Sequence, residues 1–202
     1  IKKIIERFNI DPIFINIESD GSFPNHNPDP NDDKNLTELK ELVLKEKCDL
    51  GVAYDGDGDR VGIVDELGQT IETDKLIAIF SRDIMPKTLN KKVLMDVKCS
   101  KALEEDIIRI GATPILDKNG SAYLETVMNE KNILIGGEYS GHIFFRDKHY
   151  GYDDGIYGSL RIFEILSNTN KKCSELLKGY NLYYNNPEIR LNVGDEKKYE
   201  II

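Results

Sequence analysis

The sequence predicts an α/β fold made of two duplicated three-layer modules with mixed, mostly parallel sheets. Short apolar runs typical of strands alternate along the chain with longer segments of helical periodicity. One pattern also occurs twice: an apolar strand, a polar loop and a second apolar strand occupy residues 50–64 and again 133–145. The second module opens on a strand and the first on a helix, so we expect the first module to lack its opening strand.

The first module is expected to span residues 1–89. Its predicted elements are, in order, a helix over 1–9, a strand over 12–17, a helix behind an Asn35-x-x-Glu38 cap, strands over 50–54 and 61–64, and a helix from Thr73 to Ile84. The last helix ends there because Pro86 follows.

The second module is expected to span residues 90–186 and repeats the plan. Its predicted elements are strand 93–97, a helix capped by Ser100 and stopped by Gly111, strand 113–116, helix 121–129, strand 133–135, strand 143–145, helix 154–166 and a short segment over 173–178. Residues 187–202 contain a strand-like alternation, and we expect them to form a linker towards a C-terminal domain outside this chain.

Composition limits the partners. The chain has 202 residues, of which 40% are hydrophobic and 31% charged, and no apolar run approaches the roughly 18 to 20 residues of a membrane span. The net charge is −9 and there is no basic tract, which argues against nucleic-acid binding. Three cysteines form no C-x-x-C pair, which is typical of a reducing compartment. We therefore expect a cytoplasmic protein that binds neither nucleic acid nor membrane.

The acidic run Asp55-Gly-Asp-Gly-Asp-Arg60 is the sharpest local motif. Asp55, Asp57 and Asp59 follow an apolar strand at alternate positions, and the intervening glycines allow a tight backbone. Carboxylates arranged in this way can converge on one hard cation, and Mg²⁺ suits a few carboxylates completed by water or phosphate. A surface turn is the alternative, since Asp-Gly is common in hairpins.

Two other acidic motifs compete with this interpretation. A calcium loop of the EF-hand type needs glycine at its sixth position, where this chain has Arg60, and it needs flanking helices. A haloacid dehalogenase-type phosphatase would use Asp55 as the nucleophile and Asp57 as the acid/base, with Asp153 and Asp154 for Mg²⁺. Asp59 then stands where that class has threonine or valine. This additional carboxylate favours metal binding over nucleophilic attack.

Three further segments after predicted strands carry polar groups. Glu138, Ser140 and His142 lie in a glycine-flanked loop and offer groups that can hold sugar hydroxyls and move a proton. Lys118 precedes Asn119, Gly120 and Ser121 at a helix start, where phosphate can bind, although Lys-Asn-Gly is also an ordinary turn. Lys98 ends a strand where ligands gather in open α/β sheets.

Taken together, the motifs resemble the α-D-phosphohexomutase superfamily, specifically its phosphomannomutase/phosphoglucomutase branch. The matching segments, in family order, are 23–30 (Phe-Pro-Asn-His-Asn-Pro-Asp-Pro), 55–60, 96–100 (Asp-Val-Lys-Cys-Ser), 137–142 (Gly-Glu-Tyr-Ser-Gly-His) and 151–155 (Gly-Tyr-Asp-Asp-Gly). They cover nearly the whole chain. The family has four domains, and this chain resembles most of the second together with the third.

The resemblance implies the role of each segment. It implies that Asp55, Asp57 and Asp59 bind Mg²⁺, that Arg60 supports their loop, that Glu138 and Ser140 grip sugar hydroxyls, and that Lys98 and His142 contact substrate near the transferred group. Asn119, Gly120 and Ser121 stand where relatives often have Thr-Gly-His, so sugar preference can differ there.

The resemblance also implies a reaction. Phosphate moves reversibly between O1 and O6 of mannose or glucose phosphate, through a phosphoserine and a hexose 1,6-bisphosphate. The phosphoserine and the last phosphate-binding loop belong to the first and fourth domains, which this chain lacks. We therefore expect the fragment by itself to be inactive.

Overall fold

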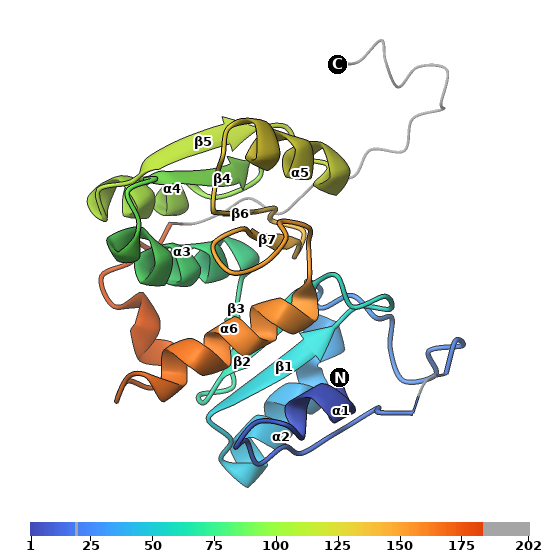
Figure 1. The fold of residues 1–202 in the computed structure, drawn as a ribbon. Coiled ribbons are helices and arrows are strands. Elements are labelled where there is room, and N and C mark those ends of the chain that lie inside the picture. The colour runs from blue at the N-terminus through green and yellow to red at the C-terminus, as the bar shows by residue number, and fades with distance from the viewer. Residues whose placement is uncertain (19, 184–202) are drawn as a thin grey trace.

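The computed structural model describes residues 1–18 and 20–183, which form two sheets with helices between and outside them (Figure 1). The linker expected over 187–202 lies outside the described residues. The α/β class is confirmed. No helix in the described part of the chain is long and apolar enough to cross a membrane.

The first sheet has the order β1-β2-β3 and consists of Leu50–Tyr54, Val61–Asp65 and Thr70–Ile71. Its three described strands pair only antiparallel, with Tyr54 opposite Val61 at the tip of the β1–β2 hairpin. A short helical turn (η1, Asp33–Leu36) leads into α2 (Thr37–Glu46), which covers one face of the sheet. Leu36, Val43 and Val64 form the core between them.

The second sheet has the order β5-β4-β6-β7, from Thr113–Asp117, Lys92–Asp96, Ile135–Gly137 and Ile143–Phe145. β4 pairs parallel with both β5 and β6, and β7 returns antiparallel to β6, so the expected parallel majority is present here. Helix α5 (Ser121–Glu130) packs on one face through Leu124 and Met128. Helix α4 (Lys101–Arg109) packs on the other, and Ser100 caps it by accepting a hydrogen bond from Leu103 N at 3.3 Å.

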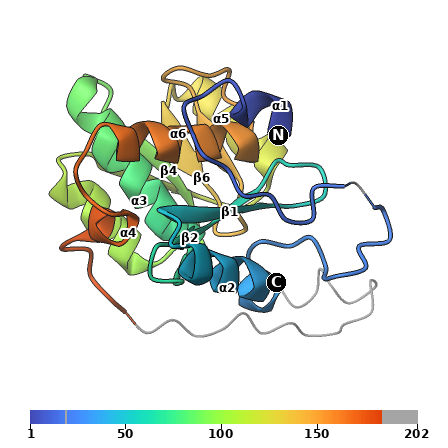
Figure 2. The same ribbon diagram turned by 90° about the horizontal axis from the view of Figure 1, so that it is seen from below.

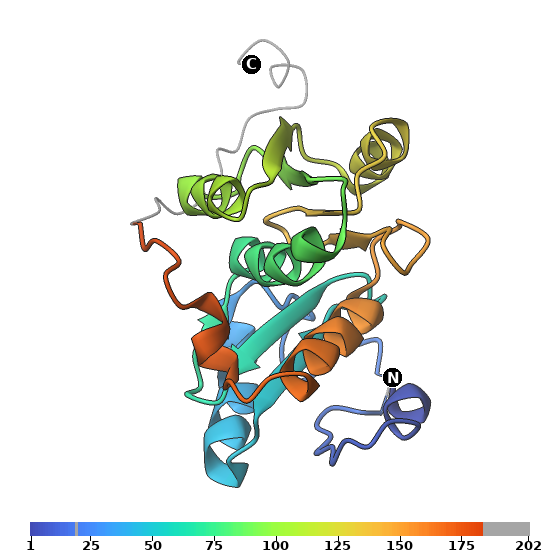
Figure 3. The same ribbon diagram turned by 60° about the vertical axis from the view of Figure 1, so that its left-hand side comes forward.

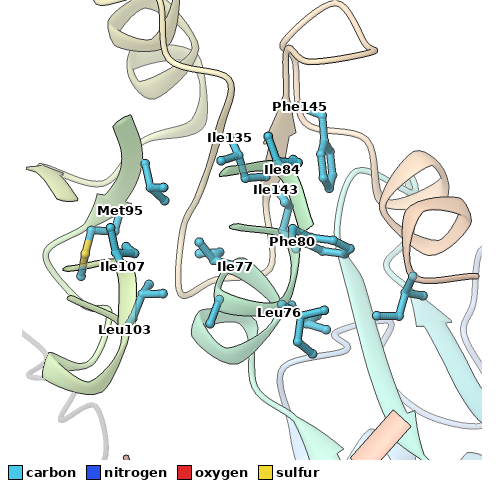
Figure 4. Close-up of a cluster of buried hydrophobic side chains, with 14 of the residues drawn as sticks. Leu76, Ile77, Phe80, Ile84, Met95, Leu103, Ile107, Ile135, Ile143 and Phe145 are labelled. Carbon is cyan, nitrogen blue, oxygen red and sulfur yellow. The ribbon is translucent and has the colours of Figure 1, made fainter. Parts of the chain in front are cut away.

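Two helices, α3 (Thr73–Ile84) and α6 (Gly155–Ser167), fill the space between the sheets (Figures 1 and 3). The view from below shows the same layers, with α2 on the outer face of the first sheet (Figure 2). Phe80 of α3 meets Phe145 of β7 edge to face, with ring centroids 4.9 Å apart (Figure 4). The same buried cluster includes Val61 of β2 and Ile162 of α6. The two modules therefore share one core, and their strand ends are fixed relative to one another.

The repeat found in the sequence is present as two hairpins. β1 and β2 enclose residues 55–60, and β6 and β7 enclose residues 138–142; both pairs are antiparallel. Short helical turns η2 (Met85–Lys87) and η3 (Cys173–Leu177) follow α3 and α6.

Three expectations about the elements were wrong. The strand expected over 12–17 is absent, and Ile13 and Ile17 are exposed, because no strand of the described part of the chain pairs with this segment to bury them. The first helix, α1, spans only Lys2–Ile5, with Ile5 its one buried side chain. The cap at Asn35 and Glu38 is replaced by Asp32, which accepts a hydrogen bond from Lys34 N at the start of η1.

The third strand of the second sheet is also displaced from its expected position. It occupies Ile135–Gly137 rather than 133–135, because pairing with β4 places Ile135 opposite Val93 and Gly137 opposite Met95. Glycine is needed at both added positions. A Cβ on Gly136 would lie 2.6 Å from Leu94 Cβ, and one on Gly137 would lie 2.8 Å from the His142 carbonyl oxygen.

Candidate active site

The loops of the two hairpins meet between the sheets. We call residues 55–60 the aspartate loop and residues 138–142 the Glu138 loop. Arg60 and His142, each the last residue of its loop, form an isolated antiparallel β-bridge. The shared core therefore brings together two motifs that lie far apart in the sequence.

Asp55 organises the aspartate loop from inside. Its Oδ1 accepts hydrogen bonds from the backbone N–H groups of Gly58 at 3.0 Å and Arg60 at 3.1 Å, and its Oδ2 accepts from Arg60 Nε at 2.6 Å. Burial alone would raise the pKa of Asp55, but these hydrogen bonds from Arg60 hold it below its usual range. A second acid, Asp29, lies 3.4 Å from Arg60 Nη1. The guanidinium is thus fixed between carboxylates.

The three aspartates fit a hard divalent cation. One oxygen from each of Asp55, Asp57 and Asp59 lies within 4.8 Å of the others. The Oδ1 of Asp59 is buried and has no hydrogen-bond partner among the described residues. Burial and the adjacent carboxylates of Asp55 and Asp57 raise the pKa of Asp59 to about 6. A bound cation would relieve this unfavourable clustering of negative charge.

His142 extends the acidic cluster to a third segment. Its Nδ1 lies 2.8 Å from Asp153 Oδ2 and 3.7 Å from Asp59 Oδ2. Burial would lower the pKa of His142, but the contact with Asp153 and the charges of Asp59 and Glu138 raise it. Asp59, His142 and Asp153 form a second group whose ligand atoms lie within 4.8 Å of one another. Asp153 is held in place by its own β-bridge to Phe144.

The first turn of α6 packs directly on the aspartate loop. Asp154 caps the helix by accepting a hydrogen bond from Tyr157 N at 2.8 Å, and Gly155 N donates to Gly58 O at 3.1 Å. A Cβ on Gly155 would lie 2.5 Å from Arg60 O and 2.8 Å from Gly58 O. Glycine is therefore required for this close approach.

Glu138 connects its own loop to the segment 118–121. One carboxylate oxygen accepts a short hydrogen bond from Gly120 N, and the other lies 3.4 Å from Ser140 Oγ. The side chain is buried although it is acidic. Glu138 and Ser140 thus lie side by side as a carboxylate and a hydroxyl, two kinds of group that form hydrogen bonds with hydroxyl groups.

Asn31 joins the modules at the same place. Its side-chain amide donates a short hydrogen bond to Ser140 O, and its Oδ1 accepts from Thr73 Oγ1 at 3.2 Å. Gly141, next to Ser140, has a φ of +107°, and a Cβ there would lie 2.9 Å from Asn31 Nδ2. The Glu138 loop is therefore enclosed by residues of the first module.

The remaining candidates lie at the carboxyl edge of the second sheet. Lys98 is exposed in the turn after β4, and Asn119 is exposed after β5. Ser121 is the first residue of α5. Lys118 places its ammonium 4.3 Å from the centre of the Tyr123 ring. The structure thus joins Gly120 to Glu138 and places Lys118 beside Tyr123 of α5.

Sequence reasoning gave no individual role to Asn31 and Asp29, and it considered Asp153 only as an Mg²⁺ ligand of a haloacid dehalogenase-type phosphatase. Asp29 lies in the proline-rich segment that physical reasoning treated as a stiff loop, and Asp153 lies in the Gly-Tyr-Asp-Asp-Gly segment. Both segments belong to the five that resemble the phosphohexomutase superfamily, and this resemblance was the sequence signal that could have pointed to the two residues. Their contacts depend on tertiary packing, so the pattern did not indicate what each residue touches.

Comparison of the sequence with known protein families assigns both parts of the chain to one family. Family models match the two parts of the chain: "Phosphoglucomutase/phosphomannomutase, alpha/beta/alpha domain II" matches residues 1–68, and domain III of the same family matches residues 72–183. The chain belongs to the phosphoglucomutase/phosphomannomutase family. The predicted resemblance is confirmed.

Individual relatives support the assignment to this family. A phosphomannomutase/phosphoglucomutase of Pseudomonas aeruginosa is 38% identical over 200 residues, 99% of this chain and 43% of that protein. A phosphomannomutase of Methanocaldococcus jannaschii is 34% identical and is matched over 97% of this chain and 43% of its own length. The chain thus spans less than half the length of these relatives.

Solved structures of the family have the same fold. The crystal structure of a phosphoglucomutase/phosphomannomutase family protein from Burkholderia thailandensis has a TM-score of 0.78 and 35% identity, covering 83% of this chain and 36% of that one. A Paramecium structure titled parafusin (phosphoglucomutase) has a TM-score of 0.61 at 24% identity, covering 76% of this chain and 29% of that one. The second likeness concerns the fold alone.

Proposed function

We propose that this chain supplies the metal-binding and sugar-binding parts of a phosphohexomutase. The enzyme would move phosphate reversibly between O1 and O6 of mannose or glucose phosphate, through a phosphoserine and a hexose 1,6-bisphosphate. The β-bridge between Arg60 and His142 is the observation that supports the proposal, because it brings the three aspartates beside the loop that carries Glu138 and Ser140. Phosphoryl transfer depends mainly on such positioning and on charge neutralisation.

Asp55, Asp57 and Asp59 would hold Mg²⁺, which when bound neutralises charge that develops on the transferred phosphoryl group. Arg60 keeps Asp55 oriented through the bond from Nε to Oδ2. The loop is then already formed before a ligand arrives, so less ordering is required on binding.

His142 would act at the reacting hydroxyl. Asp153 faces Nδ1, which leaves Nε2 as the atom that gives or takes a proton. Glu138 and Ser140 would hold sugar hydroxyls, and Lys98 would contact the substrate phosphate as a positive charge. Asn119, Gly120 and Ser121 would border the sugar, with Gly120 fixed by Glu138.

The chain by itself is expected to be inactive. It spans 43% of the Pseudomonas relative, and we place the phosphoserine and the second phosphate-binding loop in the parts of a longer polypeptide that correspond to the remainder. We also propose the domain division stated above, at residues 89 and 90, and a cytoplasmic location. Limited proteolysis followed by mass spectrometry would locate the division.

The decisive experiment assays the full-length enzyme with mannose 1-phosphate and glucose 1-phosphate, with and without hexose 1,6-bisphosphate. A mutase converts each to the 6-phosphate and is stimulated by the bisphosphate. Release of inorganic phosphate with a phosphorylated Asp55 would instead identify a phosphatase. Tight Ca²⁺ binding with no turnover of either sugar phosphate would identify a calcium-binding module.

A further inference from the structure

Asp96 lies at the centre of the carboxyl edge of the second sheet. It is the last residue of β4, the strand between β5 and β6, and its side chain is 0% exposed. The turn that follows it, residues 97–99, carries Lys98; we call this the Lys98 turn. The neighbouring strand β6 leads into the Glu138 loop. Asp96 therefore lies between two segments to which the proposed function gives substrate contacts.

One oxygen of Asp96 joins these two segments. Oδ1 accepts from Cys99 N and Cys99 Sγ, both at 3.1 Å, and this closes the Lys98 turn. The same oxygen accepts from Tyr139 N at 3.3 Å, inside the Glu138 loop. Burial and the charge of Asp96 raise the pKa of the Cys99 thiol well above its ordinary value, so the sulfur is available as a neutral donor. Hydrogen bonds to an ionised acceptor are stronger than those to a neutral one.

The connection continues from the Glu138 loop to the next loop of the sheet. Tyr139 follows Glu138 directly, and Glu138 accepts from Gly120 N after β5. A displacement of Tyr139 would therefore move Glu138 and the segment it holds. Three loops on adjacent strands are connected through two buried carboxylates and backbone N–H groups.

The second oxygen of Asp96, Oδ2, does not contribute to this connection. Oδ2 is buried and has no hydrogen-bond partner among the described residues. Leaving one carboxylate oxygen buried and unpaired is costly, so packing alone does not account for an acid at this position. The three hydrogen bonds that Oδ1 accepts are the structural observation that accounts for an acid here.

From these contacts we infer that Asp96 is a positioning residue, which fixes the Glu138 loop relative to the Lys98 turn so that both reach the same substrate. The expected effect on kinetics rests on the proposed mutase function. The connection of the Glu138 loop to the Lys98 turn through Asp96 rests on the geometry alone. The three hydrogen bonds that the Asp96 carboxylate accepts among the described residues come from Cys99 and Tyr139, and none comes from the aspartate loop or His142, so Mg²⁺ binding should be independent of it.

The test uses Asp96→Ala and Asp96→Asn in the full-length enzyme, with two measurements. Hydrogen exchange at the Tyr139 amide reports the connection directly. We expect Asp96→Ala to speed exchange there and to raise the KM for hexose 1-phosphate about tenfold, the effect of losing one hydrogen bond to a charged group. The Mg²⁺ concentration for half-maximal activity should not change. Asp96→Asn keeps an acceptor at Oδ1 and should restore most of both properties.

Ser81→Ala is the matched control. Ser81 is also fully buried, its Oγ has no hydrogen-bond partner among the described residues, and it belongs to helix α3 rather than to any of these loops. It should leave both the exchange of Tyr139 and the KM unchanged. If Asp96→Ala does not fold, Asp96→Leu, which fills the space without an acceptor, takes its place with the same expected result.

Two results would overturn the inference. One is unchanged exchange at Tyr139 in a folded Asp96→Ala or Asp96→Leu enzyme. The other is equal impairment of KM by alanine and asparagine, which would indicate a general effect of altering this buried site. Absence of mutase activity in the unmutated enzyme would instead count against the proposed function, and the exchange measurement would still test the connection.

Discussion

Asp153 lies 2.8 Å from Nδ1 of His142, so a residue just before α6 orients a side chain on the β6–β7 hairpin. Asp59 approaches the same nitrogen to 3.7 Å from the other module. Two carboxylates therefore face one nitrogen of the imidazole, and their negative charges stabilise its protonated form. Through Asp59, the aspartate loop also lies beside the group proposed to move a proton.

Asp153→Asn should lower the pKa of His142, because it removes the partner that opposes the effect of burial. Turnover should fall by about 100-fold, the smaller end of what a positioned proton donor contributes. NMR titration of the His142 ring in metal-free protein would measure the pKa. An unchanged ring titration would contradict this account of the pair.

Asp57→Asn should reduce mutase turnover by about 100-fold or more in the full-length enzyme, because one charged ligand of the cation is lost. Asp57 is exposed, so the fold should be unaffected. Isothermal titration with Mg²⁺ and a thermal unfolding curve would separate the two effects. Removal of metal from the unmutated enzyme by a chelator should reproduce the loss, and near-normal turnover of Asp57→Asn would refute the ligand role.

Glu138→Ala should weaken discrimination between sugars more than it weakens Mg²⁺ binding. The side chain contacts Ser140 and the Gly120 amide, whereas the proposed cation ligands are on the other hairpin. Parallel kinetics with mannose and glucose 1-phosphates, and a metal titration, would measure the two properties. A loss of Mg²⁺ affinity as large as the loss of discrimination would count against this division.

Gly155→Ala should displace the aspartate loop, because the added Cβ would lie 2.5 Å from the Arg60 carbonyl oxygen. The cost of such overpacking is about 1–3 kcal/mol, which should appear as weaker Mg²⁺ binding or lower stability. Gly21→Ala is the control, since a Cβ at Gly21 meets nothing within 4 Å. Equal metal affinity and equal stability in both variants would show that the contact is not restrictive.

Asp106 gives a prediction for stability at low pH. It pairs with Arg82 and Arg109, and although its burial would raise the pKa, these contacts hold the pKa below its usual value. A lowered folded-state pKa contributes stability above the unfolded pKa of about 4 and loses it as the pH falls through the folded value. Asp106→Asn should therefore cost about 2 kcal/mol at pH 7, and less below pH ~4.

Urea unfolding at several pH values would measure this difference. Glu104→Gln is the control, because Glu104 forms an exposed pair with Lys101 on the same helix. Exposed pairs contribute about 0–1 kcal/mol, so little change is expected. A difference for Asp106→Asn that stays constant from pH 7 down to pH 3 would contradict the assignment.

Local sequence was sufficient to predict those features of the fold that depend on residues close together in the chain. The aspartate loop follows from the alternation of Asp and Gly after an apolar strand, and the Ser100 cap follows from its position before a helical pattern. The two hairpins were recognisable because each is an apolar pair around a short polar loop. These features form from contacts a few residues apart, so periodicity and spacing describe them.

Long-range packing decided the rest. The alternation over residues 12–17 formed no strand because an alternating pattern needs a partner strand, and β6 shifted into Gly136 and Gly137 because of its register with β4. Spacing did not reveal that Asn31 would reach Ser140, or that Asp153 would face His142. The sequence alone identified the chemical groups and the loops that carry them. Tertiary structure decided which groups meet, because a shared core between two sheets sets the distances between segments more than 70 residues apart.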